Sequence, residues 1–315
     1  MENKNELLLL RPRSLSAVVS DGYRLYMGTF RTLFRSSWGV AVVYALAFAL
    51  FMGNVVNNVI PLCVATYSPS SLHHQPSAFF LHPFTLLYIL AVLFLAAQAV
   101  RVLREHSATG GVSRPQHWYG RLCLKDFLRV LVVGLWAFVL AVVIDVVLVG
   151  IAYAALSLGI VGNLWKSVAF AVLILVLMLA IAAICLPFHY TFMRALIGGE
   201  GKVQLAPPVK GYAKGLRHWG LLFATTLVVS IFTGLLTLVC ELPAVIMATA
   251  NTMAYVGLAQ GDPLGMPENM VPLTYVVFFI AGFIQAYVHL STLYPLYYAY
   301  GSIEQQEAER LKIED

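Results

Sequence analysis

The sequence predicts an all-α membrane protein, a polytopic bundle of about six transmembrane helices arranged as three hairpins. Three observations predict this class. The 315 residues are 60% hydrophobic and 11% charged, whereas soluble domains carry about 25% charged residues. Six apolar runs of about 20 residues or more are long enough to cross a hydrocarbon core of about 30 Å. The basic residues gather between alternate runs, which is the distribution that membrane insertion produces.

The apolar runs place the spans as follows, from the first to the last: Trp38 to Ile60, Phe84 to Leu103, Phe127 to Ser157, Ser167 to Tyr190, Trp219 to Met247 and Leu273 to Tyr300. The third, fifth and sixth runs are longer than a straight crossing needs, so we expect tilt, kinks or helix that continues past the bilayer. Pro187, Pro243 and Pro295 are the expected kink sites because proline interrupts the helical hydrogen bonds.

The positions of Lys and Arg predict the orientation, because basic loops stay in the cytoplasm during insertion. Of the 20 basic residues, Lys166 alone falls in a loop predicted to lie outside. The connections around residues 68–83 and 248–271 contain no Lys or Arg and are predicted to lie outside as well. Both termini are therefore expected in the cytoplasm. The orientation explains the basic charge, so nucleic acid is not an expected partner.

Three regions follow from this topology. Residues 1–37 form a cytoplasmic N-terminal segment with an interfacial helix, residues 38–303 form the six-span membrane domain, and residues 304–315 form a charged cytoplasmic tail. The N-terminal segment is polar and basic and lacks the short apolar core and cleavage site of a signal peptide, so the chain is expected to be inserted intact.

A short aromatic and basic stretch precedes each outward-going span. In the third copy Tyr212 and Trp219 share one helical face, and the basic residues lie on another. The middle copy is shorter and centres on Trp118 and Arg121. Such helices can lie among anionic lipid headgroups, and the alternative is a protein cap packed on the bundle. The residues predicted to contact headgroups are Arg24, Arg31, Arg35, Lys210, Lys214 and Arg217.

The order of elements resembles two bacterial membrane families, the YciC-like proteins and the membrane domain attached to some glycerophosphodiester phosphodiesterases. The likeness spans about residues 14–303 and rests on Gly-Tyr pairs and a Trp before spans one and five, and on a Pro followed by aromatic residues at the ends of spans four and six. These residues are Gly22, Tyr23, Trp38, Gly211, Tyr212, Trp219, Pro187 and Pro295. The resemblance implies a bacterial cytoplasmic (inner) membrane protein. The phosphodiesterase domain has no counterpart in these 315 residues, so no catalytic residue is carried over.

Two carboxylates, Asp145 and Glu241, lie within or at the edge of apolar runs, and intramembrane ionisable groups are functional candidates by default. Counting from the starts of their spans places both near the outer boundary. Asn54 and Asn57 lie at the same end of the first span. The sequence therefore predicts an outer polar vestibule that binds a cation or a polar headgroup. The alternative is a set of water-exposed helix ends.

Gln285 and His289 share one face of the sixth span, and His189 lies at the inner end of the fourth. We interpret them as ligand-binding or helix-to-helix hydrogen-bonding residues, and a bis-histidine haem is the less favoured alternative. No cofactor and no metal site are predicted. Cys63 and Cys240 both fall on the outer side, and a disulfide between them is left open.

No nucleophile motif, metalloprotease motif or paired acids appear in a suitable context, so an enzyme is the less favoured class. The leading hypothesis is a non-enzymatic membrane protein that moves or binds a solute or lipid. The alternatives are a membrane scaffold or accessory subunit, with a protein partner or a second copy of the chain, and a membrane-embedded enzyme acting on lipid. A transporter should show polar groups reaching the midplane, whereas a scaffold should have a dry bundle.

Overall fold

The computed structural model describes residues 9–59, 83–110, 124–157, 164–198, 209–261, 267 and 269–314, and every regular element within these ranges is helical. The elements are α1 (Leu15–Asn54), the π-helical turn η1 (Val55–Val59), α3 (Pro83–Thr109), α4 (Leu124–Ser157), α5 (Leu164–Ile197), α6 (Tyr212–Arg217), α7 (Trp219–Ala259), α8 (Met270–Ser291) and α9 (Leu293–Glu314). The predicted all-α class is confirmed.

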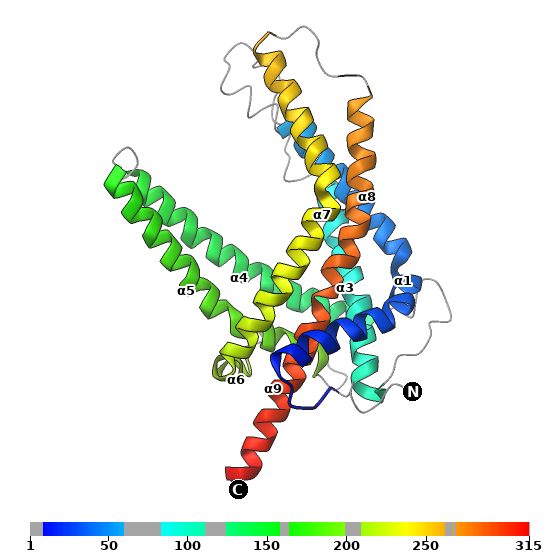
Figure 1. Ribbon diagram of the computed structural model, residues 1–315, viewed down its shortest axis with the longest axis vertical. Helices are drawn as coiled ribbons and strands as arrows, with labels where there is room; N and C mark the ends of the chain where they lie inside the picture. The colour runs from blue at the N-terminus through cyan, green and yellow to red at the C-terminus, as the bar shows by residue number, and fades with distance from the viewer. Residues whose placement is uncertain are drawn as a thin grey trace.

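Six helical stretches are long and apolar enough to cross a membrane: Leu15–Asn57, Thr85–Thr109, Leu124–Ile151, Val168–Ile197, Trp219–Gly257 and Met270–Ile313. Each overlaps one of the six predicted spans, so the chain is a multi-pass membrane protein. At one end of the bundle α3 and α5 end and α4 and α6 begin (Figure 1). Arg104 near the end of α3, Arg194 in the last turn of α5 and Arg217 of α6 belong to these segments, and we call this end the basic end. The first and the last stretch extend well beyond the predicted spans at this end.

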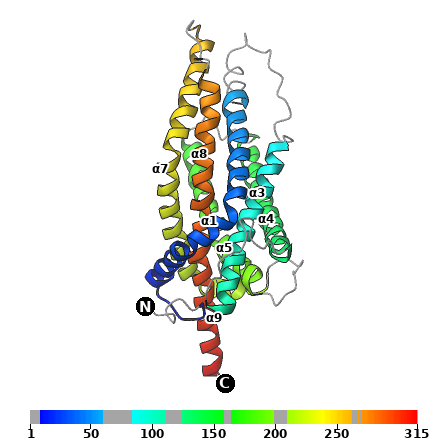
Figure 2. The same cartoon turned by 90° about the vertical axis from the view of Figure 1, so that its right-hand side faces the viewer.

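The first helix joins the predicted N-terminal helix and the first span into one element of 40 residues. Ser14 begins it by accepting a hydrogen bond from the Ala17 backbone N–H at 3.4 Å. Residues 35–38 contain neither Pro nor Gly, so nothing there ends the helix. Instead α1 bends, and its first part runs across the long axis of the molecule (Figures 1 and 2). Ser36 and Ser37 both donate to the Leu33 carbonyl, a pattern that bends helices.

The first helix is also the centre of the bundle. It packs against α3, α8 and α9, and α7 packs along α8 (Figure 2). Small residues permit the close approaches, as expected for membrane helices. At Gly282 on α8, an added Cβ atom would lie 2.7 Å from the Phe48 ring on α1. The bundle core is therefore built by α1, α3, α7 and α8.

The first and third hairpins make equivalent contacts at the basic end. Gly22 of α1 lies against Pro295 of α9, where an added Cβ atom would approach the Pro295 Cα to 2.6 Å. Gly215 of α6 lies against Pro187 of α5, where the Pro187 carbonyl oxygen would be 2.9 Å away. In each contact a glycine of α1 or α6 thus lies against a proline within an inward-going helical stretch. The middle copy, residues 111–123, lies outside the described residues.

The hairpin of α4 and α5 packs on the other helices near the basic end, through contacts with α3, α6 and α9. From there it diverges from α7 and α8 toward the opposite end (Figure 1). Its side chains are apolar and exposed around both helices, for example Val143, Val146, Leu175 and Leu179. An apolar surface of this kind suits contact with lipid chains.

Candidate functional site

A polar cluster lies inside the bundle where four helices meet. Tyr44 of α1 is buried, and its hydroxyl donates to the Gln285 side-chain oxygen on α8 at 3.2 Å. The Tyr88 hydroxyl of α3 lies 3.3 Å from that of Tyr44. On the other side of Gln285, the half-buried carboxyl of Glu241 on α7 is in hydrogen-bonding range of the Gln285 amide. We call these four residues, Tyr44, Tyr88, Gln285 and Glu241, the membrane cluster.

The hydrogen bonds of the membrane cluster run in one direction. Because Tyr44 gives its proton to Gln285, the bond between the two tyrosines uses the Tyr88 proton. Gln285 presents its oxygen to Tyr44, which leaves its NH₂ group to donate toward Glu241. Every donor thus points along the chain to the carboxyl. One carboxyl oxygen of Glu241, Oε1, is buried without a hydrogen-bond partner among the residues described.

The cluster lies well inside the membrane layer. Tyr44 follows Arg35 by nine residues, which corresponds to about 14 Å along the helix. Tyr88 precedes Arg101 by 13 residues, or about 20 Å. Counted from the basic end, both positions fall in the middle of a hydrocarbon core of about 30 Å. Glu241 shares this level through Gln285, although α7 needs more residues to reach it because it is tilted (Figure 1).

Aromatic rings surround the tyrosine side of the cluster. The Tyr44 ring lies 5.1 Å from the Tyr88 ring and 6.2 Å from Phe48, measured between centroids. Phe51 stacks on Tyr88 at 6.1 Å. These contacts fix the ring positions and bury them. The site therefore has packed aromatic rings at one end and a single carboxyl at the other.

The structure regroups the residues of the predicted vestibule. Glu241 meets Gln285, whereas Asp145 is exposed on α4, in the hairpin that diverges from α7 (Figure 1). Asn54 and Asn57 lie at the far end of α1 and in η1, and the Asn57 backbone carbonyl accepts a hydrogen bond from Tyr255 of α7 at 3.4 Å. The structure thus joins η1 to α7 but does not bring Asp145 to them.

His189 and His289, the two histidines of the sequence prediction, are not part of the membrane cluster. His289 is exposed, one turn after Gln285 on α8. The His189 ring nitrogen Nδ1 is 3.2 Å from the Leu186 carbonyl of its own helix. Within the described ranges, no three His, Cys, Asp or Glu side chains are grouped as metal ligands would be. Cys240 is half-buried, and Cys63 lies outside the described residues.

The residues predicted to contact headgroups divide into two groups. Arg24, Arg31, Arg35 and Lys210 have exposed side chains. The other two, in or next to α6, form ion pairs with α9. Lys214 lies 3.6 Å from Glu304, and Arg217 donates to both oxygens of Glu307 at 2.9 and 3.1 Å.

Further contacts complete this attachment of α9. His218 lies 3.0 Å from Glu307, and the Tyr190 hydroxyl of α5 donates to Glu304. Glu304 and Glu307 belong to the predicted charged tail, and the structure makes them part of a helix fixed at the basic end. We call the contacts of Lys214, Arg217 and His218 with Glu304 and Glu307 the α9 clasp.

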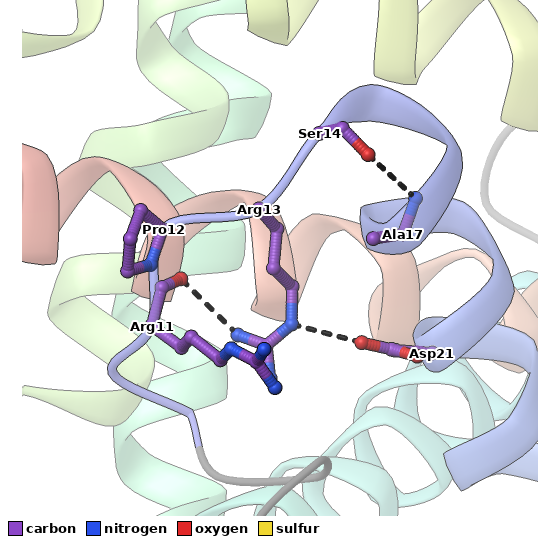
Figure 3. A pocket seen from close by; sticks show the side chains of 6 residues that line it. All are labelled: Arg11, Pro12, Arg13, Ser14, Ala17 and Asp21. Atoms are coloured by element: carbon purple, nitrogen blue, oxygen red, sulfur yellow. Dashed lines mark hydrogen bonds and ion pairs between the residues drawn. The ribbon is translucent and has the colours of Figure 1, made fainter.

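A surface cavity of 350 Å³ lies at the start of α1, lined by Arg11, Pro12, Arg13, Ser14, Ala17 and Asp21 (Figure 3). The Arg13 guanidinium donates to Asp21 at 2.9 Å and to the Leu9 carbonyl at 3.0 Å. It also lies over the Tyr298 ring of α9, 4.4 Å from the centroid. Protein groups thus hold this arginine, and it attaches the N-terminal segment to α9.

Compared with known protein families, with curated proteins and with solved structures, the chain has no significant match.

Proposed function

We propose that the protein binds a polar solute or lipid at the membrane cluster and moves it within or across the bilayer. The observation that supports this function is the Glu241 carboxyl, which lies in the hydrocarbon layer with one oxygen unpaired in the described part of the chain. A charged side chain at the centre of a bilayer costs about 2.5–3.5 kcal/mol or more, and such residues commonly mark the path of a substrate or ion. A helical bundle with only a structural role would be more stable without a carboxyl at this depth.

The proposal includes a bacterial cytoplasmic membrane location with both termini in the cytoplasm. The grouping of basic side chains at one end of the bundle supports this orientation. Anionic headgroups are proposed as partners of Arg24, Arg31 and Arg35, whose exposed side chains lie on the first part of α1. A polybasic surface of this kind attracts anionic lipid by about 1 kcal/mol per residue.

The test compares the full-length protein with Glu241→Gln, which removes the charge and retains the shape. Both are purified from the same membranes, and the small molecules and lipids that remain bound are identified by mass spectrometry. We expect a compound retained by the wild-type protein to be lost from Glu241→Gln. Asp145→Asn is the matched control, because Asp145 is also an intramembrane carboxyl but lies exposed outside the cluster.

Equal retention by the wild type and Glu241→Gln would contradict the function. If neither retained a compound while both retained the same protein partner, the scaffold hypothesis would be supported instead. A folding defect is recognised by a lowered melting temperature. In that case Glu241→Asp, which keeps the charge, decides whether the charge or the packing matters.

A further inference from the structure

We infer that the ligand bound at Glu241 carries a positively charged amine, an ammonium group of a lipid headgroup or of a soluble organic amine. This inference rests on the proposed function, because it names the chemical class that the same site accepts. It follows from three properties of the membrane cluster, namely its carboxyl, the direction of its hydrogen bonds and its aromatic rings.

The first property is a carboxyl without a cationic partner in the described part of the chain. Glu241 forms no ion pair with a Lys, Arg or His side chain among the described residues, and the group next to its carboxyl is the neutral amide of Gln285. A carboxylate in the hydrocarbon layer is stabilised by a cationic partner. An ammonium group supplies both the positive charge and N–H donors for the unpaired Oε1.

The second property excludes an anionic ligand. An anion requires donors that point into the site, but the Tyr44 proton is used by Gln285 and the Gln285 amide is directed at Glu241. What remains is an acceptor, the Glu241 oxygen without a partner in this part of the structure. A phosphate or carboxylate placed there would lie against the Glu241 oxygen, which is itself an acceptor. The site therefore accepts a donor ligand.

The third property favours an organic cation over a divalent metal ion. Ca²⁺ takes about six to eight oxygen ligands and Mg²⁺ about six, whereas this cluster contributes a single carboxyl. Aromatic rings attract an ammonium group through their faces. The rings of Tyr44 and Tyr88, with centroids 5.1 Å apart, form the end of the polar chain opposite to Glu241, and Phe51 stacks on Tyr88. A single carboxyl linked through Gln285 to aromatic side chains therefore suits an organic ammonium group better than a divalent ion.

The experiment uses the full-length protein in nanodiscs of two compositions, phosphatidylglycerol alone and phosphatidylglycerol mixed with phosphatidylethanolamine. The lipids that stay bound after transfer to detergent are counted by native mass spectrometry. A second arm titrates the protein in phosphatidylglycerol with ethanolamine or choline and measures the melting temperature. Wild type, Glu241→Gln, Glu241→Asp and Asp145→Asn are compared, with sodium chloride as the salt control.

We expect the wild-type protein to retain phosphatidylethanolamine or to be stabilised by a soluble amine, and the arm that responds identifies the source. Glu241→Gln should bind that amine about 30-fold more weakly or worse, because truncating one partner of a buried charge pair costs about 2–5 kcal/mol and each 1.4 kcal/mol is tenfold. Glu241→Asp should retain part of the binding, and Asp145→Asn should behave as wild type.

Two results would overturn the inference. If Glu241→Gln loses a neutral or anionic compound while amines bind neither protein, the amine assignment is wrong and the binding function stands. If the wild type and Glu241→Gln bind every probe equally, the binding function fails as well. Should Glu241→Gln fold poorly, competition between choline and the retained compound on the wild-type protein replaces the comparison. Displacement supports the amine, and unchanged retention contradicts it.

Discussion

The α9 clasp makes a quantitative prediction about how the C-terminal helix is held at the basic end. The Glu307 side chain is 7% exposed and accepts hydrogen bonds from Arg217 and His218. Replacing Glu307 with Gln removes the charge that both partners contact. Hydrogen bonds to charged groups contribute about 1.5–3 kcal/mol when both partners are buried. Because the Arg217 side chain is 50% exposed and regains water, we expect a loss of about 1–2 kcal/mol.

Hydrogen exchange measures this loss directly. A local destabilisation of about 1–2 kcal/mol raises the open population about 5- to 30-fold, so amide exchange in residues 300–314 should accelerate by that factor in Glu307→Gln. The rest of the bundle should exchange as before. Glu309→Gln is the matched control, because Glu309 lies on the same helix, is exposed and interacts only with Gln305 of α9 among the described contacts. Its effect should stay within about 0.5 kcal/mol.

The same experiment separates the two interpretations of the basic residues at α6. If Arg217 mainly contacts lipid headgroups, Glu307→Gln and Glu309→Gln should accelerate exchange equally, and the clasp is then unimportant for α9. If the clasp holds α9, the acceleration is specific to Glu307→Gln. Specific acceleration would assign Arg217 to the protein cap and leave Arg24, Arg31 and Arg35 as the candidates for headgroup contact.

Two further predictions test packing and orientation. Gly22→Ala should lower the stability by about 1–3 kcal/mol, because its methyl group would overlap Pro295. Thermal unfolding in detergent measures this, and Gly28→Ala is the control because no atom lies within 4 Å of an added Cβ there. A reporter that is active only outside the cytoplasm should work when inserted at Asp262 and fail when fused after Asp315; the reverse pattern would contradict the proposed topology.

The six spans and the clustering of basic residues could be predicted because both depend on composition along the chain. A run of apolar side chains forms a helix in lipid wherever it occurs, since backbone groups must be satisfied within the segment. Whether the N-terminal helix and the first span are two helices or one could not be predicted this way. The aromatic and basic pattern changes near Arg35, but a change in the environment of side chains does not interrupt the backbone, and α1 continues.

The membrane cluster was predictable only in part. Glu241 and Gln285 were identified because polar side chains in apolar runs are conspicuous, yet their pairing depends on which helices are neighbours. Helical spacing gives the face of one helix and the depth of a residue, but not the order of helices in a bundle. This is why Glu241 was grouped with Asp145. Tyr44 and Tyr88 were missed, although each is a lone hydroxyl within an otherwise apolar stretch.

The bundle core contains small and polar contact residues, whereas the α4–α5 hairpin is mostly apolar. This difference explains why the membrane cluster forms between α1, α3, α7 and α8. Lipid is as apolar as leucine, so apolar side chains alone do not choose a neighbour, whereas small and polar residues do. In the core, Gly282 admits Phe48, and Asn251 donates to Thr274 across α7 and α8 at 2.8 Å. The outer parts of α4 and α5 are mostly apolar and remain exposed. The Tyr44–Gln285 bond therefore helps to fix the helices that bring Glu241 to the centre, so the contacts that specify the bundle also build the proposed site.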